Sequence, residues 1–249
     1  MSYGDSFLEM VAKACCYVLL SSSLFMLMYF GDGFLELGLS GPDGYMLLYF
    51  GSWFLGALIY RPIRGCFESH FIKERKIYLI IGLPIILGFL MQAILSFVHV
   101  FCYWLTGSII PVGSNQYISS ESLSAVGEWI KVCLLSPFIE ELLLRYITYI
   151  VFFWLLDKLK DKSLVFRRVY DGSEDKKKKF IYVWLLVSSY IFALGHGVNI
   201  INMWFYFLPG IVYGVLFIRY GFLASWISHS IFNIASKNVH KAMMHLFGM

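Results

Sequence analysis

Residues 136–154, SPFIEELLLRYITYIVFFW, place three charged side chains inside an otherwise apolar run. They are Glu140, Glu141 and Arg145. The surrounding apolar segment, residues 128–156, is long enough to cross a hydrocarbon core about 30 Å thick as a helix. An ionised side chain near the centre of that core costs about 2.5–3.5 kcal/mol on insertion scales. This stretch therefore predicts a membrane helix whose charges have a partner or a use.

The composition of the whole chain indicates a membrane protein. Of its 249 residues, 59% are hydrophobic and 14% are charged, and the mean hydropathy is +0.71. A soluble domain carries about 25% charged residues, and the five cysteines form no Cys-x-x-Cys pair. These values exclude a soluble enzyme, a disulfide scaffold and a nucleic-acid-binding domain. The other apolar runs are residues 7–30, 44–60, 77–105, 180–198, 202–218 and 222–236.

Every apolar run must form a helix, because backbone groups in lipid have to be hydrogen-bonded within their own segment. We therefore predict an all-α fold, a polytopic transmembrane helix bundle of about seven or eight spans. Residues 1–249 are expected to form a single integral membrane domain with a polar intramembrane pocket.

The distribution of lysine and arginine predicts the orientation of the chain. Residues 61–76 hold five of these cations and residues 157–179 hold nine, whereas residues 31–43 and 106–127 hold none. Because Lys and Arg accumulate on the cytoplasmic side, the two basic loops are expected in the cytoplasm and the other two outside, with the cell membrane as the location. We therefore attribute the net charge of +4 to residues that set the orientation of the chain and contact lipid headgroups.

The C-terminal end fits this orientation less well. Counting spans along the chain leaves Lys237 and Lys241 on the outside. Either one span is miscounted, or the C-terminal stretch is a short helix at the membrane interface.

The three charges differ in the partners available to them. Glu141 and Arg145 are four residues apart and share a helix face, so they can pair. Glu140 is turned about 100° away and can face a cavity. Two other interpretations remain open: a buried ion pair with a spare carboxyl that only joins helices, and a transporter, since proton relays also place Glu and His in spans.

Two further spans carry polar residues at a spacing of four. They are Phe192 and His196 in SSYIFALGHGVN, and His229 and Asn233 in SWISHSIFN. Two histidines, an asparagine and a free glutamate on three spans indicate one convergent polar site. His196 falls near the outer end of its predicted helix, which either continues through residues 196–202 or breaks beside this histidine at the flanking glycines.

These motifs, Glu-Glu-x-x-x-Arg, Phe-x-x-x-His and His-x-x-x-Asn in this order, resemble those of the CPBP family, the CAAX proteases and bacteriocin-processing (Abi) proteins. The resemblance covers residues 128–236, and the first 127 residues are similar only in being hydrophobic. It implies an intramembrane glutamic-type endopeptidase that acts on a peptide or a lipidated protein tail among membrane lipids. No metal, cofactor or nucleic-acid partner is expected, and the oligomeric state is left open.

The resemblance also implies a role for each residue. Glu140 would act as general base on a water, and His196 would orient that water or move the proton. His229 and Asn233 would donate hydrogen bonds to the developing oxyanion. Glu141, Arg145 and Phe192 would support the site.

Two alternatives use the same pocket. In the first, Glu140, His196 and His229 are ligands of a catalytic zinc ion, since three N/O ligands and a water form an acceptable zinc site. In the second, the protein is a non-enzymatic scaffold, an immunity protein or a sensor partner that keeps the pocket as a structural feature.

Overall fold

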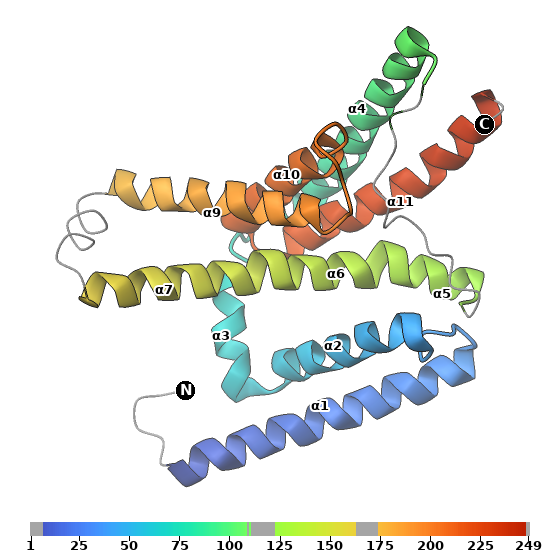
Figure 1. Cartoon of the computed structure of the whole chain (residues 1–249). Helices are drawn as coiled ribbons and strands as arrows, with labels where there is room; N and C mark the ends of the chain where they lie inside the picture. Colours follow the sequence, from blue (N-terminus) through green and yellow to red (C-terminus); the bar gives the residue numbers. More distant parts are fainter. Residues whose placement is uncertain (1–6, 109, 111–122, 163–173, 248–249) are drawn as a thin grey trace. The chain divides into compact units, whose positions relative to one another are not determined.

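The computed structural model describes residues 7–108, 110, 123–162 and 174–247. Within these ranges the chain is helical and contains no strand (Figure 1). Every apolar run predicted from the sequence lies wholly or mostly on a helix, which confirms the all-α membrane fold, while the number of spans stays a prediction. The α-helices are α1 Phe7–Leu35, α2 Pro42–Ile59, α3 Arg61–Phe71, α4 Leu83–Thr106, α5 Ala125–Ile130, α6 Ser136–Glu141, α7 Thr148–Lys162, α9 Glu174–Leu194, α10 Trp204–Tyr220 and α11 Phe222–Phe247.

Three short π-helical segments interrupt the α-helical pattern of the described ranges. They are η1 Tyr78–Gly82, η2 Lys131–Leu135 and η3 Leu142–Ile147. The first runs directly into α4, so Pro84 near the start of α4 stands within continuous helical backbone, where proline removes one backbone donor. The other two lie on either side of α6, so that helical backbone continues without a break from Ala125 to Lys162.

Among the residues that the structure describes, two helical stretches are long and apolar enough to cross a membrane, Val11–Leu35 and Tyr78–Thr106. Gly44–Ile59 and Trp204–Tyr220 are shorter apolar helices. Many large apolar side chains on α1 and α4 are exposed, as expected of helices that face lipid rather than water.

The structure corrects the prediction that the two basic segments are loops. Residues 61–76 were expected to be a loop, but α3 covers Arg61–Phe71. Pro62 stands in its first turn, where proline favours a helix start. In the basic segment 157–179, α7 extends to Lys162 and α9 begins at Glu174, while residues 163–173 lie outside the described part of the chain.

The prediction for the C-terminal stretch around Lys237 and Lys241 is also corrected. A separate short interfacial helix was one of two explanations for the lysines near the C-terminus. Instead, α11 continues without a break to Phe247. The stretch is therefore the end of the last apolar helix.

The chain divides into two compact units, Met1–Lys73 with Ile118–Ile139, and Glu74–Tyr117 with Glu140–Met249. That they form a single domain stays a prediction. In the first unit, α1 packs on α2. The Tyr17 hydroxyl donates to the Trp53 carbonyl over 2.7 Å.

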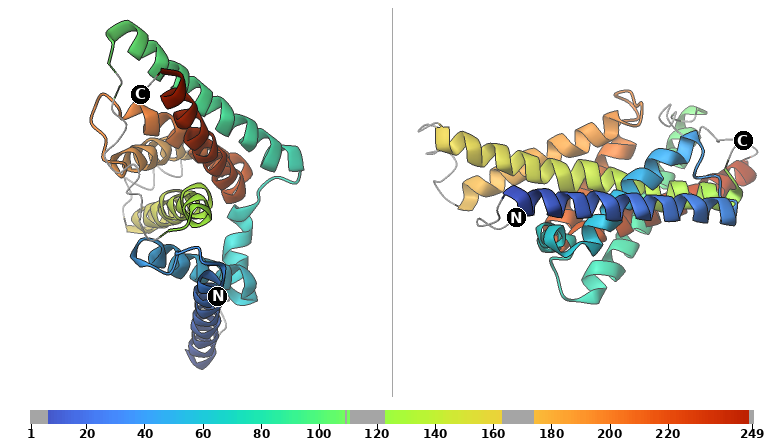
Figure 2. Two further views of the ribbon diagram at one scale, coloured as in Figure 1. Left: turned by 90° about the vertical axis from the view of Figure 1, so that its right-hand side faces the viewer. Right: turned by 90° about the horizontal axis from the view of Figure 1, so that it is seen from below.

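The second unit holds all the predicted site residues. Its helices α4 and α11 run side by side (Figure 2). They touch where α4 has Gly88, because a Cβ there would lie 2.6 Å from the Ser228 carbonyl oxygen. A cluster of buried side chains then joins α4 to α9 and α10, namely Leu95, Phe192, Ala193, Phe205, Tyr206 and Tyr213.

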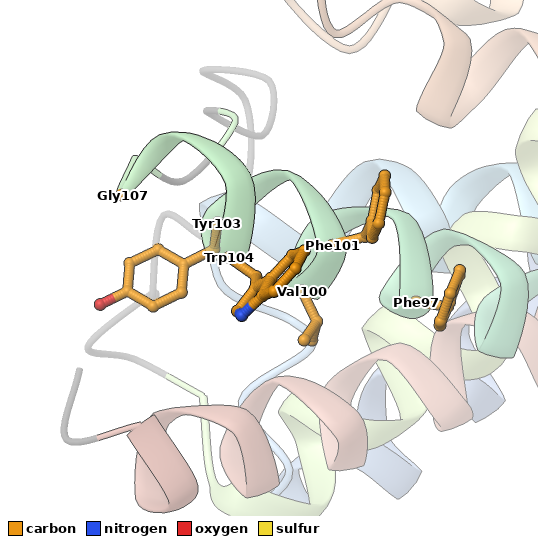
Figure 3. A pocket seen from close by; sticks show the side chains of 6 residues that line it. All are labelled: Phe97, Val100, Phe101, Tyr103, Trp104 and Gly107. Atoms are coloured by element: carbon orange, nitrogen blue, oxygen red, sulfur yellow. The ribbon is translucent and has the colours of Figure 1, made fainter.

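The C-terminal end of α4 is rich in aromatic side chains (Figure 3). They line a shallow hollow of about 430 Å³ together with Val100 and Gly107. Trp104 there is 76% exposed. Tryptophan and tyrosine at a helix end are typical of the membrane–water interface, and none of the predicted site residues lines this hollow.

Candidate active site

The two glutamates stand at the end of α6, where the helix changes to the π-helical segment η3. A π turn inserts an extra residue and so rotates the side chains that follow it. Arg145 lies within this segment, and its Nε is 3.5 Å from Glu141 Oε2, with both side chains fully buried. The structure thus pairs these two residues, as their spacing predicted.

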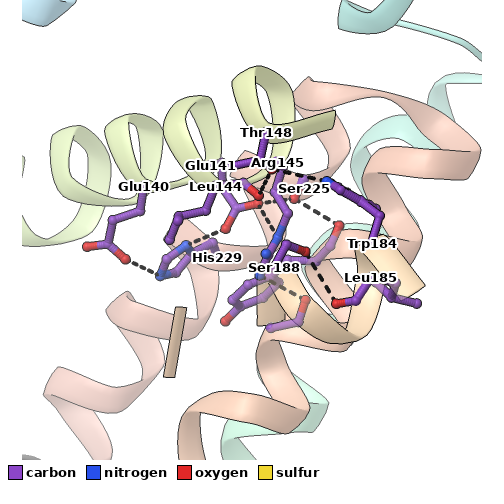
Figure 4. A network of polar contacts seen from close by, with 12 residues as sticks. Glu140, Glu141, Leu144, Arg145, Thr148, Trp184, Leu185, Ser188, Ser225 and His229 are labelled. Carbon is purple, nitrogen blue, oxygen red and sulfur yellow. Dashed lines mark hydrogen bonds and ion pairs between the residues drawn. The ribbon is translucent and has the colours of Figure 1, made fainter. Parts of the chain in front are cut away.

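Glu141 is the centre of a buried polar network (Figure 4). Besides its ion pair with Arg145, it accepts a hydrogen bond from the Ser225 hydroxyl, and its Oε1 lies 3.0 Å from His229 Nδ1. Arg145 Nη2 in turn donates to the Gly210 carbonyl on α10 over 3.0 Å. A charge in such surroundings is tolerated only when it is paired and hydrogen-bonded. Groups on α10 and α11 bond to Glu141 and to Arg145 Nη2, whereas Arg145 Nε and Nη1 have no hydrogen-bond partner among the described residues.

Glu140 faces both histidines, His196 and the network member His229. Its Oε2 lies 3.8 Å from His229 Nε2 and 3.9 Å from His196 Nε2. This oxygen is buried and has no hydrogen-bond partner within the described ranges, although the side chain as a whole is 32% exposed. The gaps are too long for direct hydrogen bonds.

His196 lies just beyond the end of α9, in a turn. The Gly197 amide donates to the Leu194 carbonyl, and Gly197 has φ +63°, the left-handed conformation in which glycine commonly ends a helix. Of the two arrangements left open by the sequence, the structure shows the break at the glycines. This turn brings His196 back toward Glu140.

The hydrogen-bond partners of both imidazoles indicate how each ring is protonated. His196 Nδ1 lies 2.8 Å from the Phe192 carbonyl oxygen, which can only accept, so Nδ1 carries the hydrogen. His229 Nδ1 in the same way faces the Glu141 carboxylate. Each ring therefore directs Nε2 toward Glu140, so that three groups converge on one small space.

The remaining predicted residues lie around this cluster. Phe192 is 3% exposed, with its ring centroid 4.7 Å from that of His196 and 5.4 Å from that of His229. The Arg145 guanidinium lies over the same ring at 5.4 Å. Asn233 is partly buried one helical turn beyond His229 on α11, and its place in the site rests on that register.

The sequence interpretation missed Ser225 and Gly210. Ser225 precedes His229 by four residues on α11, so a search for polar residues on the same helix face could have found it. Gly210 acts through its carbonyl group, which any residue type carries. No sequence signal for it was available.

The arrangement of these donors also bears on the zinc interpretation. Within the ranges that the structure describes, no group of three His, Cys, Asp or Glu side chains is arranged to hold a metal ion. The described cluster consists of one carboxylate facing two imidazoles, with a second carboxylate behind one of them.

Comparison with known proteins identifies a similar family. The family described as type II CAAX prenyl endopeptidase Rce1-like matches residues 122–235 of the chain. This range contains all three motifs and all the predicted site residues. No curated protein and no solved structure matches the chain.

Proposed function

Since the chain belongs to the CAAX protease (CPBP) family and is a membrane-embedded endopeptidase, we propose that Glu140 activates the water that cleaves the substrate. The observation that carries this proposal is the buried Glu140 Oε2, which has no hydrogen-bond partner among the described residues and faces two imidazole Nε2 atoms at 3.8 and 3.9 Å. A water in this space would contact a base and an orienting group together.

In the first step, Glu140 takes a proton from the water while the water oxygen attacks the carbonyl carbon of the scissile bond. His196 orients this water, because its Nδ1–H is engaged by the Phe192 carbonyl and its Nε2 lone pair accepts a hydrogen bond from the water. A base within hydrogen-bond reach of the proton contributes about 10²–10⁴ in rate.

The attack produces a tetrahedral intermediate with a negative oxygen. His229, whose Nδ1 faces the Glu141 carboxylate, donates to that oxyanion from a protonated Nε2. Asn233 supplies a second donor one turn further along α11. Each such donor is worth about 10²–10³ in rate.

The intermediate then collapses. Glu140, now a carboxylic acid, returns its proton to the leaving amine nitrogen as the C–N bond breaks. The products are a new carboxylic acid, which keeps the second proton of the water, and a free amine. The base of the first step is thus the acid of the second, and neither step requires a covalent enzyme intermediate.

We propose a prenylated protein or peptide tail of the CAAX type as the substrate class, which the family description names. Such a tail carries an isoprenoid on its cysteine, three residues before the C-terminus. The purified protein in lipid vesicles should release the C-terminal tripeptide from an internally quenched farnesylated peptide, as identified by mass spectrometry. Glu140→Gln should release none.

A matched control comes from the same continuous helix. Asp157 is exposed near the end of α7, so Asp157→Asn removes a carboxylate without touching the site. This variant should keep full activity. Tripeptide release by Glu140→Gln at the rate of the control would contradict the proposed function.

The charge distribution favours a second substrate class, an exported peptide such as a bacteriocin or pheromone leader. Exposed lysines stand at the end of α7 and at the start of α9, among them Lys162 and Lys179. From Lys179 to its end at Leu194, α9 rises about 22 Å, most of the thickness of the hydrocarbon core, and His196 lies in the turn that follows. If the basic ends are cytoplasmic, His196 lies toward the outer face.

Cysteine labelling distinguishes these substrate classes. Ile200, beside His196 in the turn after α9, is 81% exposed. With the basic ends inside, a membrane-impermeant maleimide on intact cells should label Ile200→Cys and leave Lys179→Cys unlabelled until the cells are permeabilised. The unsubstituted chain measures the background from native cysteines. The opposite pattern would eliminate the exported-peptide substrate and leave the prenylated tail.

A further inference from the structure

Both active-site histidines lie face to face with tyrosines of one helix, α10. The Tyr206 ring stacks on the His196 imidazole with centroids 4.2 Å apart and planes at 26°. The Tyr213 ring stacks on the His229 imidazole at 4.6 Å and 14°. The two tyrosines are seven residues apart, so they project from nearly the same side of a helix with 3.6 residues per turn.

These tyrosines are deeply buried. Tyr206 is 7% exposed and Tyr213 is fully buried. Each touches the face of an imidazole, whereas Phe192 packs against both imidazoles at steep angles of 58° and 80°. Each histidine ring is thus held between a parallel aromatic face and the tilted ring of Phe192.

Gly210 fixes α10 at the distance that this stacking needs. It lies between the two tyrosines in sequence, and a Cβ on it would come within 3.2 Å of Arg145 Nη2, of the Phe192 ring and of the Ser189 side chain. The carbonyl group of Gly210 also binds Arg145. The α10 backbone therefore packs directly on α9, which precedes His196, and on the Arg145 side chain of η3, which follows Glu140.

From this geometry we propose that Tyr206 and Tyr213 are positioning residues of the active site, which set the planes of His196 and His229 by stacking. The proposal rests on the proposed function. A hydrogen bond at Nδ1 fixes one atom of each ring but leaves rotation about that bond. A parallel aromatic face removes this rotation and holds Nε2 toward Glu140.

Stacking has a second consequence for catalysis. A protonated imidazole that donates to the oxyanion is a cation over an electron-rich ring, and cation–π attraction favours that arrangement most when water is excluded. Tyr213 beneath His229 meets this condition, because both side chains are almost fully buried. Tyrosine rings at these two positions are therefore expected to act mainly on kcat.

The test compares Tyr206→Leu, which removes the flat ring, with Tyr206→Phe, which keeps it. Using the farnesylated peptide and the full-length protein in vesicles, Tyr206→Leu should lower kcat by about 10–100-fold, as expected when a catalytic group shifts by about 1 Å. KM should change little, and Tyr206→Phe should restore most of the rate. Tyr213→Leu and Tyr213→Phe should repeat the pattern.

A control variant separates positioning from general packing. Phe217 lies on the same helix, is fully buried and packs against the rings of Tyr149 and Trp184 rather than against an imidazole. Phe217→Leu should lower thermal stability but leave kcat of the folded protein unchanged. If Tyr206→Leu does not fold, Tyr206→Met replaces it in the test, because its flexible side chain fills the same space.

Two results would overturn the proposal: wild-type kcat in folded Tyr206→Leu and Tyr213→Leu, or phenylalanine variants as impaired as the leucine variants. Glu140→Gln is measured in the same assay. If Glu140→Gln is inactive while the leucine variants cleave at the wild-type rate, the positioning role of the tyrosines is refuted and the proposed function stands. If it cleaves normally, the proposed function itself fails.

Discussion

Removal of the Arg145 side chain should destabilise the protein far more than an average substitution. Arg145 is fully buried, lies 3.5 Å from the equally buried Glu141 carboxylate and donates to the Gly210 carbonyl. Arg145→Met fills much of the volume but leaves that carboxylate with only Ser225 and His229. Breaking a buried ion pair from one side costs about 3–5 kcal/mol, which for a chain of this size lowers Tm by on the order of 10 °C.

A double-mutant cycle measures whether the charge of Glu141 is the reason. Glu141→Gln in the Arg145→Met background removes the stranded charge, and replacing a buried ion pair by neutral groups is often close to neutral. The double variant should therefore recover at least half of the lost stability.

The assay heats the detergent-solubilised protein and follows the folded fraction by size-exclusion chromatography. Abundance in membranes provides a second readout, and the coupling energy of the cycle should be at least about 2 kcal/mol. A single Arg145→Met variant as stable as the wild type, or a double variant less stable than either single one, would refute the reasoning.

Two further substitutions test the packing around the site. Ser225→Ala removes a hydroxyl that donates to Glu141. Because a hydrogen bond to a charged group is worth about 1.5–3 kcal/mol, Tm should fall while cleavage persists. An unchanged Tm would contradict this. Gly88→Ala places a Cβ 2.6 Å from the Ser228 carbonyl oxygen and should cost about 1–3 kcal/mol, whereas Gly82→Ala meets nothing nearer than 3.9 Å and should be tolerated. Equal stability of the two alanine variants would show that α4 and α11 do not touch at Gly88.

The positions of the helices follow from simple sequence patterns. Apolar runs near bilayer length predict them because lipid leaves the backbone no other partner. The pairing of Glu141 with Arg145 was predictable for a related reason, since a charge buried there needs a neighbour on the same helix face. In contrast, the charge content of residues 61–76 led to the prediction of a loop. The helix α3 that lies there could have been predicted from Pro62, which marks its start.

The contacts between helices were not predictable in the same way. Tyr206 and Tyr213 are two of seventeen tyrosines in the chain, and nothing local distinguishes them. Their stacking on His196 and His229 depends on how α10 is rotated and how closely Gly210 lets it approach. The π-helical segment η3 changes the rotation of the side chains after Glu141, which the regular 3.6-residue spacing does not anticipate.

The central claim is that the Glu140 carboxylate activates water, and its most direct test is the single-turnover rate of Glu140→Gln. The variant keeps the size of the side chain and its place opposite His196 and His229, but loses the base. We predict that the rate of the cleavage step falls by about 10²–10⁴-fold with peptide binding unchanged. Cleavage at the wild-type rate by folded, purified Glu140→Gln protein would contradict the account.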